Sequence, residues 1–180
     1  MTAERALILD FGGVVTRTLF ETHDLSERAL GLPPGTLDWR GPFAPETDTL
    51  WRAMQSGRIS ERDYWAGRSR EVGALIGQNW AELRLFVRAA RGADPAAVIR
   101  PEFHDAVVQA RAAGAKLAIL SNELDLFYGT DFREKLPFLK QFDAIVDATY
   151  TNILKPDPRA YALVLQDLGL HPENCVFVDD

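Results

Sequence analysis

The stretch LILDFGGVV, residues 7–15, decides the fold of this chain. Leu7–Leu9 form an apolar run that is short enough for a buried strand, and Asp10 ends the run. Gly12 and Gly13 follow at once and indicate a tight turn. The sequence therefore predicts a short buried strand whose carboxyl end carries an acidic side chain.

Three later apolar segments have the length of further strands. They are Lys116–Leu120, Ala144–Ala148 and Cys175–Val178, the last of which is predicted to be a buried strand with Cys175 as a packing residue. Amphipathic helices are expected between them: Pro101 opens one that stops at Gly114, and Pro158 opens one that stops at Gly169. Because strands that alternate with helices form parallel β-α-β units, the predicted fold class is α/β with a doubly wound parallel sheet.

Residues 17–98 do not follow this alternation. They contain helix-like segments, one of them capped by Ser60, and all four tryptophans of the chain, Trp39, Trp51, Trp65 and Trp80. We expect these tryptophans to form the core of a small helical subdomain rather than a ligand cage. The sequence thus predicts an α/β catalytic core from residues 1–16 and 99–180, with a helical cap inserted at residues 17–98.

Composition excludes several classes of protein. With 180 residues, 47% hydrophobic and 26% charged, the chain is globular and long enough for a sizeable core. The single Cys175 excludes an internal disulfide framework, and neither a secretory pattern nor a membrane-length apolar run is present. Residues 101–180 hold 13 acidic and 7 basic side chains, which argues against nucleic-acid binding. A cytoplasmic protein without a membrane partner is expected.

Polar residues end three of the predicted strands: Asp10, Ser121–Asn122 and Asp179–Asp180. Lys155 lies between another strand and the helix that follows it. Taken singly, each has a plain structural explanation, such as a cap or a surface lysine. Ligands of open α/β sheets, however, bind at the carboxyl ends of the strands. Together these residues supply a carboxylate nucleophile, ligands for Mg²⁺, and donors and a cation for a phosphate, which phosphoryl transfer needs.

Four segments in this order resemble the haloacid dehalogenase-like hydrolase superfamily: LILDFGGVV, LAILSN (117–122), LKPDPRAY (154–161) and CVFVDD (175–180). The insertion after the first segment matches the cap position of the helical-cap branch. SGRISERDYWA (56–66) is similar to the cap of the subgroup that contains a glucose 1-phosphate phosphatase. The resemblance implies a Rossmann-like core and a Mg²⁺-dependent phosphatase of a small phosphorylated metabolite, with a sugar phosphate as one candidate.

The resemblance also implies a role for each motif residue. Asp10 is expected to be the nucleophile that becomes an aspartyl phosphate, with Ser121 and Lys155 as its catalytic partners. The expected Mg²⁺ ligands are Asp10, the backbone carbonyl of Gly12, Asp179 and Asp180. The residues expected to bind the substrate are Ser121, Asn122, Lys155 and Gly12.

One position departs from the superfamily pattern. Its phosphatases usually carry a second aspartate two residues after the nucleophile, where it acts as general acid and base, and here that position is Gly12. The glucose 1-phosphate subgroup also tolerates glycine there. The departure predicts slow hydrolysis, a preference for good leaving groups, or an acid/base from elsewhere, for which His23 and Asp24 are candidates.

Two other functions stay open at this point. The first is a non-catalytic binding protein that kept the fold, which Gly12 favours. The second is a metal-independent 2-haloacid dehalogenase, because such enzymes also lack the second aspartate. The superfamily usually continues past the fourth motif, so a truncated chain or a shortened sheet, and weak Mg²⁺ binding, are expected. The sequence does not indicate the oligomeric state.

Overall fold

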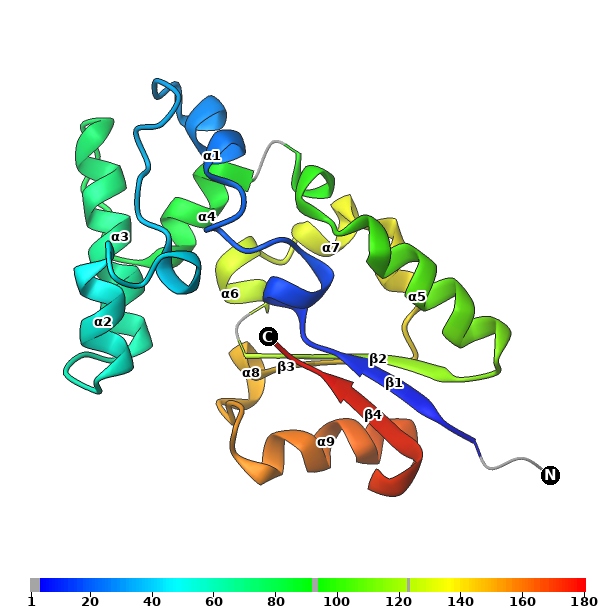
Figure 1. Cartoon of the computed structure of the whole chain (residues 1–180). Coiled ribbons are helices and arrows are strands. Elements are labelled where there is room, and N and C mark those ends of the chain that lie inside the picture. Colours follow the sequence, from blue (N-terminus) through cyan, green and yellow to red (C-terminus); the bar gives the residue numbers. More distant parts are fainter. Residues whose placement is uncertain (1–3, 92–93, 123) are drawn as a thin grey trace. The chain divides into compact units, whose positions relative to one another are not determined.

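The computed structural model describes residues 4–91, 94–122 and 124–180 (Figure 1). The chain divides into two compact units. The core unit comprises Met1–Arg17 and Pro95–Asp180, and the helical unit comprises Thr18–Asp94. The helical unit is thus inserted into the core unit after the first strand and its turn.

The core unit is built on a four-stranded parallel sheet with the order β3-β2-β1-β4. The strands are β1 (Ala6–Leu9), β2 (Lys116–Ser121), β3 (Ala144–Asp147) and β4 (Cys175–Val178). In register, Leu7 lies between Leu117 and Val176. This topology confirms the predicted α/β fold class.

Helices cover both faces of the sheet (Figure 1). One face packs against α5 (Pro101–Ala112), α6 (Leu124–Tyr128) and α7 (Phe132–Lys135), and the other against α9 (Pro158–Leu168). Helix α8 (Ala148–Thr151) directly follows β3. Short helical turns occupy Phe11–Val15, Pro95–Val98, Pro137–Gln141 and Pro172–Asn174.

The ends of α5 and α9 follow their predicted signals. Each begins with a proline at its first position, where no backbone N–H is needed. Before α9, the carboxylate of Asp157 accepts a hydrogen bond from the backbone N–H of Arg159. Gly169 then takes a left-handed conformation with φ +66° and ends the helix.

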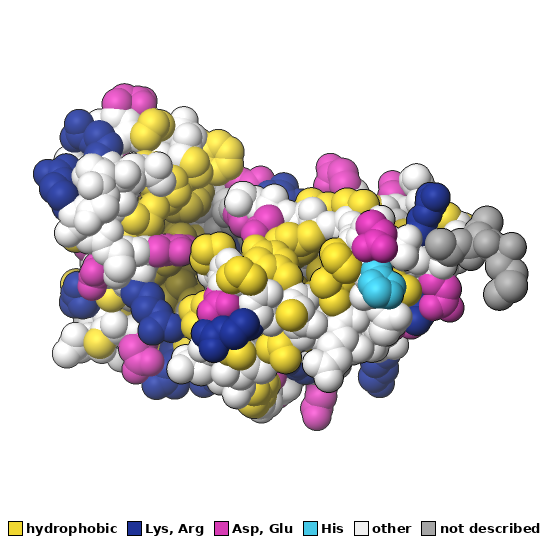
Figure 2. Space-filling model, turned by 90° about the horizontal axis from the view of Figure 1, so that it is seen from below, with side chains coloured by type: hydrophobic (Ala, Val, Ile, Leu, Met, Phe, Trp, Pro, Cys, Tyr) yellow, Lys and Arg dark blue, Asp and Glu magenta, His cyan; other side chains and the backbone are white. Residues whose placement is uncertain are grey.

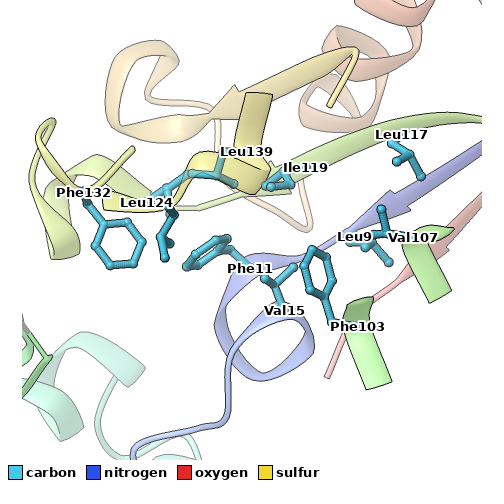
Figure 3. Close-up of a cluster of buried hydrophobic side chains, with 11 residues drawn as sticks. Leu9, Phe11, Val15, Phe103, Val107, Leu117, Ile119, Leu124, Phe132 and Leu139 are labelled. Atoms are coloured by element: carbon cyan, nitrogen blue, oxygen red, sulfur yellow. The ribbon is translucent and has the colours of Figure 1, made fainter. Parts of the chain in front are cut away.

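Phe11 anchors the residue before it, Asp10, to the core (Figure 3). Its ring is fully buried and meets the rings of Tyr128 and Phe132 edge-on, at centroid distances of 5.5 and 5.7 Å. The same cluster contains Leu9, Val15, Phe103, Val107, Leu117, Ile119, Leu124, Leu136 and Leu139. Burying a phenylalanine side chain stabilises a fold by about 1.5–3 kcal/mol, so the backbone around Asp10 is firmly placed.

Strand β4 corrects one prediction. Cys175–Val178 was expected to be buried, but Val176 is 62% exposed and Val178 is 38% exposed. The reason is the cover of this face: Leu7, the partner of Val176 in β1, packs against the cluster on the α5 face, to which β4 contributes no residue. Cys175 and Phe177 do pack against the cluster on the α9 face.

The helical unit contains α1 (His23–Leu30), α2 (Thr49–Gln55), α3 (Glu61–Leu75) and α4 (Leu83–Arg91). A short turn of 3-10 helix spans Gly41–Phe43. Helix α3 begins with a capping box, in which Ser60 and Asp63 bond each other's backbone N–H groups. The tryptophans contribute to an aromatic core, with Trp39 and Trp65 both near the ring of Phe20 at 5.6 and 5.2 Å.

A buried ion pair lies next to this aromatic core. The carboxylate of Asp48 accepts hydrogen bonds from the Tyr64 hydroxyl at 2.9 Å and from the Trp51 backbone N–H at 2.8 Å. The Arg68 guanidinium pairs with the same carboxylate and lies over the Trp39 ring at 5.4 Å. With these partners, the charge of Asp48 is compensated inside the helical unit.

Apolar side chains also reach the surface. On the face drawn in Figure 2, hydrophobic side chains lie next to both acidic and basic ones. The large exposed hydrophobic residues are Phe43, Leu75, Val108, Leu126, Tyr150, Val176 and Val178. Along the described part of the chain, no helix combines the length and the apolar character that a bilayer crossing needs.

His23 gives the helical unit a pH-dependent stability. Its ring is 5% exposed and packs edge-on against Trp39 at 4.2 Å, and neither ring nitrogen has a hydrogen-bond partner among the described residues. Burial, and next the charge of Arg40, lower the pKa of His23 to about 4, despite the nearby Glu27. The unfolded chain therefore binds more protons than the folded one between pH 6.5 and 4.

We therefore expect the free energy of unfolding to fall as the pH is lowered through this window. The His23 contribution to the loss between pH 7 and pH 5 is about 2 kcal/mol. Urea denaturation at the two pH values measures it in the wild type and in His23→Phe, which removes the titrating group. His104→Gln, at an exposed position of α5, is the matched control and should behave as the wild type. An equal pH-dependent loss in His23→Phe and wild type would contradict this assignment.

Candidate active site

The carboxyl ends of all four strands carry polar side chains. Ser121 ends β2 and Asp147 ends β3, while Asp10 follows β1 and Asp179 follows β4. Because the strands are parallel, these ends lie at one edge of the sheet. The backbone N–H of Asp10 also donates to the Val178 carbonyl at 2.9 Å, which joins the end of β1 to the end of β4.

Three aspartates meet at this edge. One carboxylate oxygen each from Asp10, Asp179 and Asp180 lies within 4.8 Å of the others. Asp10 is the most enclosed of the three, with 9% of its surface exposed. Carboxylate oxygens at this spacing are the donors that Mg²⁺ prefers, so the group fits the cation that the sequence predicts.

Lys155 neutralises part of this negative charge. Its ammonium nitrogen lies 3.0 Å from Oδ1 of Asp10 and 2.8 Å from Oδ1 of Asp179. The side chain is 9% exposed and passes over the ring of Phe177, 5.0 Å from its centroid. Lys155 therefore presents its charge at a defined place beside the candidate nucleophile.

Asp10 is tuned by its surroundings. Burial raises its pKa to about 6, although the Lys155 ammonium and its hydrogen bond act in the opposite direction. Burial, and next the Asp179 carboxylate, also raise the pKa of Asp180. At pH 7 most Asp10 side chains are still ionised and can act as nucleophiles, and a bound cation would favour this form further.

The side chain of Asn122 holds the backbone of Lys155. Its amide oxygen accepts the backbone N–H of Lys155 at 2.6 Å, and its amide nitrogen donates to the Lys155 carbonyl at 3.3 Å. The side chain predicted to bind substrate thus bonds the backbone that carries Lys155. Ser121, the residue before it, is 7% exposed at the end of β2.

Gly12 and Gly13, which follow the candidate nucleophile Asp10, leave different amounts of space for a side chain. A Cβ at Gly13 would lie 2.1 Å from Oδ2 of Asp180, and its φ of +80° also favours glycine. Gly13 thus allows Asp180 to approach the turn. At Gly12 the backbone is extended, with φ −70° and ψ 129°, and a Cβ would meet no described heavy atom within 4 Å outside the adjacent residues.

Arg100 also reaches this turn, and the sequence did not indicate it. Its Nε donates to the Gly13 carbonyl at 2.8 Å, and its charge acts on the Asp180 carboxylate. The two bonded residues are 87 positions apart, so no local pattern could have revealed the contact.

The two alternative acid/base candidates lie in the helical unit. His23 is buried beside Trp39, as described above. Asp24 is exposed and forms an ion pair with Arg28 one helical turn later, at 3.0 Å. In the helical unit, therefore, His23 is enclosed and Asp24 already has a partner.

The carboxyl edge of the parallel sheet thus carries an enclosed aspartate, two further aspartates and a lysine. This combination is typical of a class of hydrolases with an α/β core. The family model described as haloacid dehalogenase-like hydrolase matches residues 4–180. The chain belongs to this family.

The chain is also similar to individual proteins. The chain is 42% identical over 81 residues to acyl-CoA dehydrogenase family member 10 of Mus musculus, covering 44% of this chain and 7% of that protein. It is 26% identical to a phosphoglycolate phosphatase of Pseudomonas putida, covering 95% of this chain and 56% of the relative. The chain thus spans well under two thirds of these two relatives.

A solved structure shows the same fold. An L-2-haloacid dehalogenase superimposes with a TM-score of 0.59 at 21% identity, covering 98% of this chain and 78% of the other. At this identity the similarity concerns the fold.

Proposed function

We propose that the protein is a Mg²⁺-dependent phosphatase of a small phosphorylated metabolite that acts through a phosphorylated Asp10. The observation that carries the proposal is the cluster of Asp10, Asp179 and Asp180, in which Asp10 and Asp179 both contact the ammonium of Lys155. The similarity to a phosphoglycolate phosphatase over 95% of the chain supports a phosphate monoester as substrate. The cap-like stretch at residues 56–66 adds sugar phosphates to the candidates.

The donor set of the site suits Mg²⁺. In the proposal, carboxylates of Asp10, Asp179 and Asp180 hold the ion together with the backbone carbonyl of Gly12. The raised pKa values of Asp10 and Asp180 agree with this, because enclosed carboxylates in close proximity gain from a cation between them. When bound, the ion neutralises charge on the phosphoryl oxygens and so reduces their repulsion of the nucleophile.

In the first step, a carboxylate oxygen of Asp10 forms a bond to phosphorus while the bond from phosphorus to the ester oxygen breaks. The ester oxygen leaves with its electron pair and takes a proton from water. Lys155 and Ser121 bind the phosphoryl oxygens during this transfer, through an ammonium and a hydroxyl group.

In the second step, water attacks the phosphorus of the phosphorylated Asp10 and releases inorganic phosphate. The bond from phosphorus to the Asp10 oxygen breaks, so Asp10 returns to its carboxylate form, and the proton of the attacking water passes to the hydroxide that the first step left in the solvent. Because Gly12 cannot accept that proton, this step is slow, and the phosphorylated protein persists during turnover.

A metal-independent dehalogenase is less well supported by this site. The carboxylate of a 2-haloacid would approach three aspartates, whose negative charge Lys155 and Arg100 compensate only in part. Like charges at such distances repel, whereas a phosphoryl group can share a cation with the same aspartates. The solved dehalogenase shares the fold at 21% identity and does not favour its reaction here.

Hydrolysis of p-nitrophenyl phosphate tests the proposal, because its activated leaving group hardly needs a general acid. We expect turnover with millimolar Mg²⁺, loss of turnover in EDTA, and recovery when Mg²⁺ is added again. A panel of sugar phosphates and phosphoglycolate then identifies the substrate. The opposite outcome is a folded protein that shows no turnover at high Mg²⁺, both as the given sequence and as a version extended past Asp180. That outcome would favour a non-catalytic protein.

A further inference from the structure

Asp147 is a buried carboxylate outside the four motifs. It is the last residue of β3, and its side chain is 1% exposed. Its Oδ1 accepts the backbone N–H groups of Leu124 at 3.1 Å and Thr149 at 2.9 Å. Its Oδ2 accepts the backbone N–H of Asp125 at 2.8 Å. One side chain thus satisfies three backbone donors that come from two different segments.

Both segments are connected to the proposed phosphoryl-binding residues. Leu124 and Asp125 open α6, three and four positions after Ser121. Thr149 lies in α8, which leads to Lys155 six positions later. Asn122 adds a second connection, since its side chain bonds the backbone of Lys155. Asp147 therefore ties the start of α6, beyond Ser121, to the start of α8, before Lys155.

The charge of Asp147 is compensated by a second layer of contacts. The Arg133 guanidinium lies 3.5 Å from Oδ2 of Asp147, and its Nε lies 3.0 Å from Oδ1 of Asp125. Asp125 is also buried and accepts the Tyr150 hydroxyl at 2.6 Å. Buried charges with complete partners hold one geometry, because breaking any contact leaves a costly unpaired group.

We propose that Asp147 is a positioning residue that sets the spacing between Ser121 and Lys155. The inference rests on the proposed function, in which these two side chains bind the phosphoryl group. A displacement of about 1 Å in such groups can lower a rate by about 100-fold. A residue that fixes the starts of both α6 and α8 therefore controls the rate without touching substrate.

Asp147→Asn tests this inference. The substitution keeps the size of the side chain. It replaces one carboxylate oxygen, which accepts a backbone N–H, by an NH₂ group, which cannot accept a hydrogen bond. We expect kcat/KM for p-nitrophenyl phosphate to fall by about 10- to 100-fold and the inhibition constant of inorganic phosphate to rise. Asp147→Ser is the second variant, because serine can still cap α8 at Thr149 but cannot bond both Leu124 and Asp125.

Asp143 provides a matched control, because it directly precedes β3 and so lies at the amino-terminal end of the strands. It accepts the Leu117 backbone N–H at 2.7 Å and forms an ion pair with Arg111 at 3.0 Å. Asp143→Asn thus removes the same charge and disturbs a similar backbone contact away from the carboxyl edge. Its kcat and KM should equal those of the wild type, even if its stability falls. Equal kinetic losses in the Asp143 and Asp147 variants would overturn the inference, because they would indicate a general structural effect.

Amide hydrogen exchange gives a readout that does not depend on activity. The amides of Leu124 and Asp125 should exchange faster in Asp147→Asn and at the wild-type rate in Asp143→Asn. If the wild type does not hydrolyse the ester, the proposed function fails. Independently of activity, unchanged exchange of the Leu124 and Asp125 amides in Asp147→Asn would refute the role of Asp147 in tying α6 to α8. If the wild type is active, wild-type kinetics in a folded Asp147→Asn or Asp147→Ser would refute the positioning role.

Discussion

Replacement of Asp10 by asparagine is expected to lower the turnover of p-nitrophenyl phosphate by about 10⁴-fold or more. The amide is neutral and poorly nucleophilic, so the bond to phosphorus cannot form at a useful rate. Lys155 keeps its contact with Asp179 at 2.8 Å, and the Phe11 ring stays in the core, so the fold should remain. The measurement is steady-state hydrolysis with saturating Mg²⁺.

A covalent readout makes this prediction specific to the nucleophile. Intact-protein mass spectrometry after acid quenching should detect a phosphoryl adduct on the wild type and none on Asp10→Asn. Asp157→Asn is the matched control, because Asp157 caps α9 two residues after Lys155 and is expected to keep full turnover. Residual activity above one tenth of wild type in Asp10→Asn would exclude Asp10 as the attacking group.

Replacement of Gly12 by aspartate is expected to increase the hydrolysis of unactivated alkyl phosphates by about 10²- to 10⁴-fold, the usual contribution of a general acid and base. A Cβ at Gly12 is accommodated, since it meets no described heavy atom within 4 Å outside the adjacent residues and the backbone of its own turn. The backbone there, with φ −70° and ψ 129°, accepts any L-residue. The measurement compares kcat/KM for a sugar phosphate and for p-nitrophenyl phosphate.

A comparison of leaving groups distinguishes a rate increase caused by proton transfer from one caused by a change in folding. Protonation matters for an alkoxide and little for p-nitrophenolate, so the bond-breaking step with p-nitrophenyl phosphate should change by less than about 10-fold. Gly12→Asn is the matched control, because it has the same shape without a titrating proton, and it should not raise the rate with the alkyl ester. A gain with Gly12→Asn equal to that with Gly12→Asp would rule out proton transfer as the cause.

Local sequence signals were sufficient to predict the strands and helix that position the candidate site. Apolar runs that end in Asp10, Ser121 and Asp179 identified three strands and the edge at which their polar residues meet. Pro158 and Gly169 marked the ends of α9, because proline and glycine act on the backbone of their own residues. Such signals act over a few residues, which is why they can be recognised without the tertiary structure.

Contacts between distant residues required the folded chain. Asn122 bonds a backbone 33 positions away, and Arg100 reaches the Gly13 carbonyl over 87 positions. Nothing in the local pattern of Asp147 distinguishes it from a solvated aspartate, and the exposure of Val176 depends on how far the helices cover its face of the sheet.

The chemistry of Asp10 shows the same division. From the sequence, Asp10 was a candidate nucleophile only in combination with the polar ends of the other strands and through the family resemblance. Its pKa of about 6 depends on enclosure and on Lys155, which lies 145 positions later. Residue type and local pattern are written along the chain, whereas desolvation and charge pairing arise when distant segments pack, so only the tertiary structure determined them.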